Sequence, residues 1–175
     1  PADQIDGWLN DPQKADLIRP NRPGTYSYFY LINFMPTYDE RDGLSHEQWL
    51  AAANNVNFRK SLYYGLDRVK AVGCYDPHTP EEYVLRTITP YNFCAATGVG
   101  EYTQTGSLAA ISNTDSYNAD LALEYKAKAV EELTAAGVTF PIMAYMPYNS
   151  ESTSQTSLAV VVSQQLEALL GTDYI

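Results

Sequence analysis

The sequence predicts an α/β fold in which a mixed sheet carries flanking helices. Runs of aromatic and β-branched residues at 26–34 and 140–146 are typical of buried strands. Segments with an apolar period near 3.6 residues at 55–72, 118–137 and 152–171 are typical of amphipathic helices. Because a helix that joins two strands of one sheet forms a crossover, this order implies that some strands are parallel.

The size and charge of the chain limit its organisation and its partners. With 175 residues, 45% of them hydrophobic, the chain can form one packed domain but not two ordinary ones. We therefore expect a turn-rich lead-in at 1–24 and a single α/β domain at 25–175. The net charge of −10 argues against a nucleic-acid partner or an anionic membrane surface, since a polyanion would be repelled.

No apolar run approaches the roughly 18 residues that span a bilayer. The chain starts at Pro1 without the basic and apolar regions of a signal peptide. We therefore expect the chain as given to be soluble and to be a processed or excised piece of a longer protein.

The first half of the domain is predicted to contain a strand and two helices. The strand at 26–34 lies between Pro23-Gly24 and Pro36, and its continuous apolar character predicts burial on both faces. Ser45 precedes good helix formers, so it predicts the N-cap of a short helix. The apolar stripe of residues 55–72 predicts one longer helix that ends by Gly73 and packs on the strand.

An irregular connection is predicted at 74–117, with a short helix at 80–85, because Pro and Gly interrupt every periodic pattern there. After it, Asn118 is expected to cap a helix that ends at Gly137. A short strand follows at 140–146.

A last helix is predicted to start at Ser152 or Thr153 and to end before Gly171. Residues 173–175 have the character of another strand that is cut short, so the predicted sheet is incomplete.

The sequence indicates no catalytic residue, metal site or cofactor site. His46 and His78 lie in polar or turn-forming surroundings, without a neighbouring nucleophile motif. The acidic clusters at 39–42 and at Glu81-Glu82 have the residue types of an acid/base pair or a calcium site. Clustered surface acids are, however, the ordinary way in which a chain of this charge stays solvated.

Cys74 and Cys94 lie 20 residues apart, which is not a metal-ligand spacing. Their positions are compatible with a disulfide across the irregular connection or with two free thiols that pack as small apolar residues. The sequence leaves both alternatives open.

The segment 55–68 resembles the signature helix of family 5 extracellular solute-binding proteins, the oligopeptide-binding receptors of ABC importers. The residues that match the pattern of that family are Val56, Arg59, Leu62, Asp67 and Arg68. The residues that depart from it are Asn57, Lys60, Ser61 and Gly65.

Further segments resemble the same family and stand in the family's order. Residues 28–33 look like its aromatic strand, 117–137 like a helix that ends in Ala-Gly before a strand, and 155–171 like a helix that ends in Leu-Gly. The resemblance covers residues 25–175. It implies a lobe of the periplasmic-binding-protein type II kind.

The resemblance also implies a function. It implies a periplasmic or cell-surface receptor, membrane-anchored as a lipoprotein, whose two lobes close on an oligopeptide and deliver it to an ABC permease. Members of the family are much longer than this chain, so the resemblance implies part of the lobe beyond the hinge. It implies no cofactor and no enzymatic activity.

The resemblance suggests two groups of site residues. Tyr28, Tyr30 and Asn33 are the expected ligand-binding residues, because hydroxyl and amide groups bond to a peptide backbone. The alternative is that these rings pack between lobes. We expect a structural role for three residues of the signature helix, Arg59, Asp67 and Arg68.

The sequence is also compatible with two other function classes. With 15 tyrosines, the chain fits an extracellular interaction module that binds a protein or glycan without lobe closure. A hydrolase that uses Glu81 or Glu82 is the weakest alternative, because no acid lies in an apolar context that would raise its pKa.

Overall fold

A computed structural model describes residues 2–18, 26–37, 44–91 and 93–175. The chain divides into two compact units, and each is described by itself. The first unit comprises Pro1–Phe29 and Tyr75–Thr114, and the second comprises Tyr30–Cys74 and Asp115–Ile175. The acidic cluster at 39–42 lies outside the described residues.

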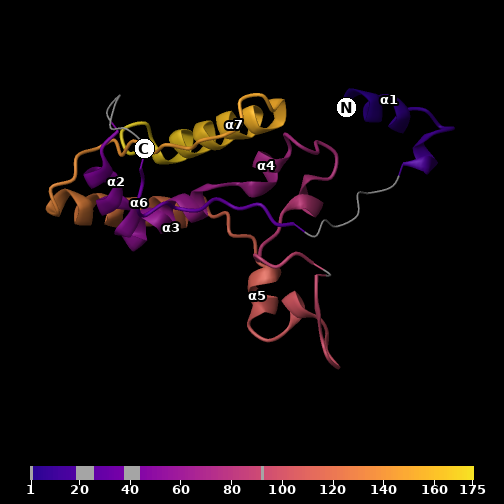
Figure 1. Cartoon of the computed structure of the whole chain (residues 1–175), viewed down its shortest axis with the longest axis horizontal. Helices are drawn as coiled ribbons and strands as arrows, with labels where there is room; N and C mark the ends of the chain where they lie inside the picture. The colour runs from indigo at the N-terminus through magenta and orange to yellow at the C-terminus, as the bar shows by residue number, and fades with distance from the viewer. Residues whose placement is uncertain (1, 19–25, 38–43, 92) are drawn as a thin grey trace. The chain divides into compact units, whose positions relative to one another are not determined.

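The second unit is built from helices. Its helices are α2 (His46–Asn54), α3 (Val56–Gly65), α4 (Arg68–Val72), α6 (Ala119–Ala135) and α7 (Thr153–Leu170). Helices α3 and α6 lie side by side, and α7 contacts both of them (Figure 1). The apolar faces of these three helices therefore form most of the core of this unit.

The starts of α2, α6 and α7 lie where the sequence predicts them. Ser45 Oγ accepts a hydrogen bond from Gln48 N at 3.3 Å and so caps α2. In the same way Asn118 caps α6 and Ser152 caps α7. Each cap satisfies a backbone N–H that has no partner inside the helix.

The predicted end of α6 is also confirmed. Gly137 has φ +81°, a left-handed conformation that glycine adopts without steric cost. Val138 N then donates to Leu133 O at 2.9 Å, which closes the helix in a Schellman motif.

The prediction of one helix over 55–72 is wrong, because the chain breaks into α3 and α4 at Leu66 and Asp67. Both residues have extended backbone angles, with ψ of 110° and 99°. Asp67 accepts a hydrogen bond from Lys70 N at 3.0 Å and starts a new helix. A short polar side chain that bonds to a nearby N–H competes with continuation of the helix. The apolar period gives no information about this competition, so it predicts one helix.

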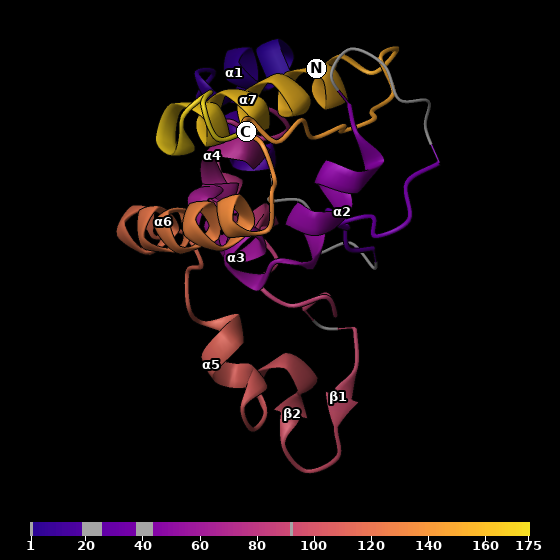
Figure 2. The same ribbon diagram turned by 90° about the vertical axis from the view of Figure 1, so that its left-hand side faces the viewer.

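The predicted strands at 26–34 and 140–146 are not part of a sheet in the described residues. In the part of the chain that the structure describes, the only sheet is a two-stranded antiparallel one in the first unit, with β1 (Ala95–Ala96) paired to β2 (Gly100–Glu101) (Figure 2). Residues 26–33 and 142–149 have no regular secondary structure. The α/β fold class therefore stays a prediction.

Burial of the segment 26–34 on both faces is wrong for this chain. Leu31, for example, is 80% exposed. A strand is covered only where neighbouring strands and an adjacent layer lie against it, and no described segment pairs with this one. Near the other predicted strand, Ile142 N donates to Tyr174 O at 2.9 Å, a contact that a parallel β–α–β unit would also make.

The first unit holds short elements. They are α1 (Ala2–Leu9), η1 (Ala15–Leu17), η2 (Pro80–Tyr83), η3 (Tyr102–Gln104) and α5 (Leu108–Ser112), besides the β1–β2 hairpin. The expected short helix at 80–85 is present as the 3₁₀ turn η2. Asp6 Oδ1 on α1 lies 2.7 Å from His78 Nε2, so α1 contacts the residues that precede η2.

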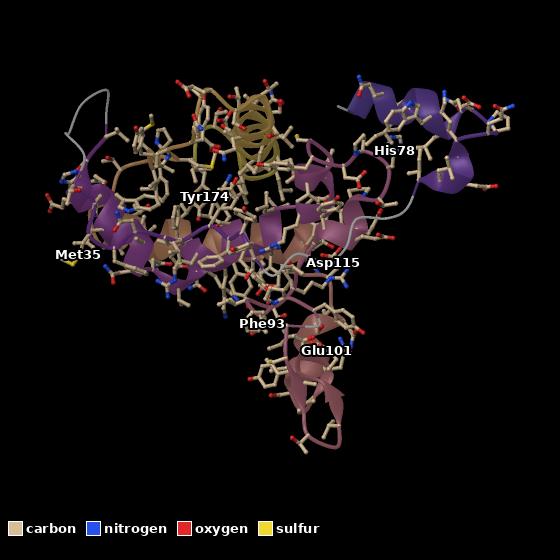
Figure 3. All side chains as sticks on the ribbon, turned by 45° about the vertical axis from the view of Figure 1, so that its right-hand side comes forward. Met35, His78, Phe93, Glu101, Asp115 and Tyr174 are labelled. Carbon is tan, nitrogen blue, oxygen red and sulfur yellow. The ribbon has the colours of Figure 1, made fainter. Side chains whose placement is uncertain are left out.

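Tyr174 occupies the centre of the second unit, where it is 1% exposed (Figure 3). Its ring stacks on Phe140 at 5.5 Å between centroids and lies 5.7 Å from the ring of Phe58. Its hydroxyl makes a 2.9 Å hydrogen bond with Ser61 Oγ, which is fully buried on α3. The predicted strand start at 173–175 is thus a tail that fills the core.

Replacing either of two glycines of this unit by alanine should change the stability of the fold, in opposite directions. At Gly65 a Cβ would meet Leu166 and Leu169 at 3.5 Å, an ordinary contact, so Gly65→Ala should stabilise α3 by about 0.5–1 kcal/mol. At Gly171, φ is +88° and a Cβ would lie 2.2 Å from Asp173 Oδ1, so Gly171→Ala should destabilise the fold. Thermal unfolding of both variants tests this, and a lower melting temperature for Gly65→Ala would contradict it.

Tyr174 should make the stability of the second unit fall at high pH. Burial raises the pKa of Tyr174 from 10.0 to about 12. Because the folded-state pKa is the higher one, the stabilisation is complete below pH 10 and is lost as pH rises toward 12. Tyr174→Phe should cost about 1 kcal/mol at neutral pH through the lost hydrogen bond and should weaken the decline above pH 10. Urea unfolding of both chains across this pH range gives the comparison, and equal declines would contradict it.

Candidate functional site

The aromatic segment contains two of the expected ligand-binding residues, and both present their rings to solvent. Tyr28 belongs to the first unit and is 94% exposed. Tyr30 belongs to the second unit and is 53% exposed. An exposed tyrosine offers an apolar ring together with a hydroxyl that donates and accepts hydrogen bonds. Both side chains are therefore open to contact with a ligand.

The third expected residue, Asn33, is fixed by local contacts. Its carbonyl oxygen accepts a 2.7 Å hydrogen bond from Trp49 Nε1 on α2. Its side-chain Oδ1 accepts from Met35 N at 2.9 Å, which forms an Asx turn. A peptide that bonded to this oxygen would have to compete with the turn.

Arg59 and Arg68 hold neighbouring segments together. Arg59 Nη1 donates to Ala53 O at 2.5 Å, so α3 is joined to the end of α2. Arg68 Nη1 donates to Tyr63 O at 3.3 Å and also to Ser116 Oγ, which joins the end of α3 to the residues before α6. Burial is the main cause that lowers the pKa of Arg68. Both side chains act between parts of the second unit.

Sequence reasoning missed a polar cluster between α3 and α6. Asn57 Nδ2 donates to both carboxylate oxygens of Glu132 at 2.9 Å, and Asn55 Nδ2 donates to Oε2 at 2.7 Å. These hydrogen bonds lower the pKa of Glu132, and the contribution of Asn57 is the largest. The sequence signal for this cluster was Asn57, because it departs from the pattern of the solute-binding proteins that the segment resembles.

A groove of about 270 Å³ lies in the second unit, between the end of α3, α4 and α7. Its polar lining residues are Asp67, Lys70, Tyr117 and Gln165. Asp67 N donates to Gln165 Oε1 at 3.1 Å, so α4 is fastened to α7. The signal for this contact was present in the sequence, since Gln165 is a polar residue within the otherwise apolar stripe of α7.

The first unit has a groove of its own, of about 320 Å³. Its lining is mainly apolar and includes Ile88, Tyr102, Leu108 and Ile111. Arg86 is its charged lining residue. It contains no arrangement of acid, base and nucleophile.

The remaining chemical candidates are also placed by the structure. Cys74 is a half-buried free thiol in the second unit and Cys94 an exposed free thiol in the first. These two free thiols do not support a disulfide between Cys74 and Cys94. Across the described ranges, no group of three or more His, Cys, Asp or Glu side chains could hold a metal ion. No helix within those ranges is long and apolar enough to cross a membrane.

Comparison with known proteins gives one informative similarity. No protein-family model matches the chain. The chain is 30% identical over 135 residues to the oligopeptide-binding protein AliA of Streptococcus pneumoniae serotype 4. That similarity covers 69% of this chain but 20% of the relative, so the chain spans about a fifth of the relative's length. The chain is therefore a distant homologue of part of an oligopeptide-binding protein.

Asp67 should contribute to stability through its cap. Asp67→Ala removes the acceptor for Lys70 N and should cost about 1 kcal/mol, the usual cost of a lost N-cap. Asp67→Asn is the matched control, because an asparagine oxygen caps a helix equally well. Thermal unfolding should rank the wild type and Asp67→Asn above Asp67→Ala. An unchanged melting temperature for Asp67→Ala would show that the cap contributes nothing.

Proposed function

We propose that this chain is part of the substrate-binding component of an ABC transporter, which binds oligopeptides for import. The observation that carries this proposal is the similarity to an oligopeptide-binding protein over 69% of the chain. The resemblance of residues 55–68 to the signature helix of the same class of receptor agrees with that similarity.

In this proposal Tyr28, Tyr30 and Asn33 contact the peptide. The two rings are exposed and can pack on peptide side chains while their hydroxyls bond to the peptide backbone. The contacts of Asn33 with Trp49 and Met35 hold the end of the segment in place. A fixed segment loses less conformational entropy on binding than a mobile one.

The proposed mechanism is closure of two lobes. A peptide that contacts both lobes of a longer receptor favours the closed state, and a membrane permease recognises that state. The role requires no catalytic residue, metal or cofactor, so we propose a protein without enzymatic activity. The proposed location is extracytoplasmic, in the periplasm or at the cell surface, with a membrane anchor on the full-length protein.

A second candidate function is an extracellular interaction module that binds a protein or glycan. The exposure of Tyr28, Tyr30 and Leu31 favours it, since a contiguous exposed aromatic and apolar stretch is typical of binding surfaces. The two candidate functions differ in the ligand of the aromatic segment, which is an oligopeptide in the first and a protein or glycan in the second.

Peptide retention tests the proposal. Equilibrium dialysis of the 175-residue chain against a mixed peptide digest, read by mass spectrometry, should show peptides enriched with the protein. Tyr30→Ala should reduce this enrichment by about tenfold, because a central aromatic contact typically contributes more than 1 kcal/mol to binding. Asn33→Ala should reduce it as well.

The matched control is Tyr148→Ala, since Tyr148 is an exposed tyrosine of the same unit outside the aromatic segment. It should leave the enrichment unchanged. If no peptide is enriched, or if Tyr148→Ala acts as strongly as Tyr30→Ala, peptide binding by this segment is refuted. Retention of an oligosaccharide or a protein instead would favour the interaction module.

A further inference from the structure

We infer that the groove between α3, α4 and α7 is a binding site for a small zwitterion, an α-amino acid with an aliphatic side chain. The inference rests on the polar and apolar lining of this groove and not on the proposed peptide site. Tyr28, Tyr30 and Asn33 do not line it.

Two opposite charges line the groove and leave each other unpaired. Lys70 is an exposed lysine on α4, and no ion pair joins it to Asp67 in the described part of the chain. Asp67 uses one carboxylate oxygen, Oδ1, to accept from Lys70 N, so Oδ2 remains for another donor. An ammonium group and a carboxylate group on one small molecule would satisfy both side chains.

The amide of Gln165, a residue that lines the groove, has one donor without an acceptor in the described part of the chain. A backbone N–H needs an acceptor, and Asp67 N donates to Oε1, so this contact fixes which end of the amide is oxygen. The Nε2 on the other side is buried and has no acceptor in the described residues. A buried donor without an acceptor costs free energy, and a carboxylate beside Gln165 would remove that cost.

The size and the apolar wall of the groove select the ligand class. Its volume of about 270 Å³ lies just below the roughly 300–1,000 Å³ of common ligand pockets, which favours a molecule of amino-acid or dipeptide size. Gly65, Ala168 and Leu169 form its apolar part and suit an aliphatic side chain. The net charge of −10 repels anions at long range but leaves a zwitterion unaffected.

Three ligands with the same side chain test the charge requirement. Binding of L-leucine, N-acetyl-leucine and leucinamide to the 175-residue chain is measured by saturation-transfer NMR titration. Leucine carries both charges, and each of the other two carries one. Leucine should bind with a Kd on the order of 1 mM, and each analogue should bind about tenfold more weakly, as expected for one lost charge-assisted contact.

Variants then locate the site. Lys70→Gln should weaken leucine binding about tenfold and leave leucinamide binding unchanged, because leucinamide has no carboxylate. Asp67→Asn keeps the helix cap, and it should weaken leucine binding to a similar extent. Gln165→Glu keeps an acceptor for Asp67 N, and it should also weaken binding, because a carboxylate replaces the donor. Lys128→Gln is the control, since it removes the same charge from α6 outside the groove.

The inference is overturned if leucine does not bind, if the three ligands bind equally, or if Lys70→Gln binds leucine like the wild type. Leucyl-leucine decides between the two ligand sizes: tighter binding than leucine would assign the groove to a dipeptide. Tyr30→Ala separates this site from the proposed function, because it should leave leucine binding unchanged. Loss of leucine binding in that variant would contradict a separate groove site.

Discussion

The second unit depends on the burial of one aromatic side chain close to the end of the chain. Tyr174 contacts Phe58 and Ser61 on α3 and Phe140 after α6, so it joins the end of the chain to two segments that are distant in the sequence. Burying a large aromatic ring contributes several kcal/mol, and its hydroxyl must keep a hydrogen bond to avoid a desolvation cost. The ring therefore determines how closely α3 approaches the segment that follows α6.

Contacts at the helix ends complete this arrangement. The apolar faces of α3, α6 and α7 do not by themselves fix the register of one helix along another, because apolar burial is non-directional. Directional bonds supply that register. Glu132 binds Asn55 and Asn57 at one end of α3, and Tyr64 O accepts from Asn118 N at 2.9 Å near the other end. The polar cluster that sequence reasoning missed is thus part of what holds the core together.

The two candidate binding regions differ in how they are built. The aromatic segment is an exposed stretch of chain whose end is fixed through Asn33, and the large side chains that it exposes are mainly aromatic. The groove beside α4 is lined by helix residues and is charged on one side and apolar on the other. The two regions share no residue.

The sequence by itself determined the starts of α2, α6 and α7 and the end of α6. Ser45, Asn118, Ser152 and Gly137 specify local hydrogen bonds or backbone angles that form within a few residues, so the pattern of neighbouring residues is sufficient to predict them. The resemblance to oligopeptide-binding receptors was likewise readable from local motifs, and the comparison with AliA confirms it at the level of distant homology.

Only the tertiary structure decided which residues meet. The exposure of the segment 26–34 and the groove lined by Lys70 and Gln165 both depend on partners distant in sequence. A strand-like pattern shows that a segment suits a sheet, but a sheet forms only when other strands donate and accept the hydrogen bonds. The described residues provide no such strands for this segment, so its apolar side chains stay in solvent.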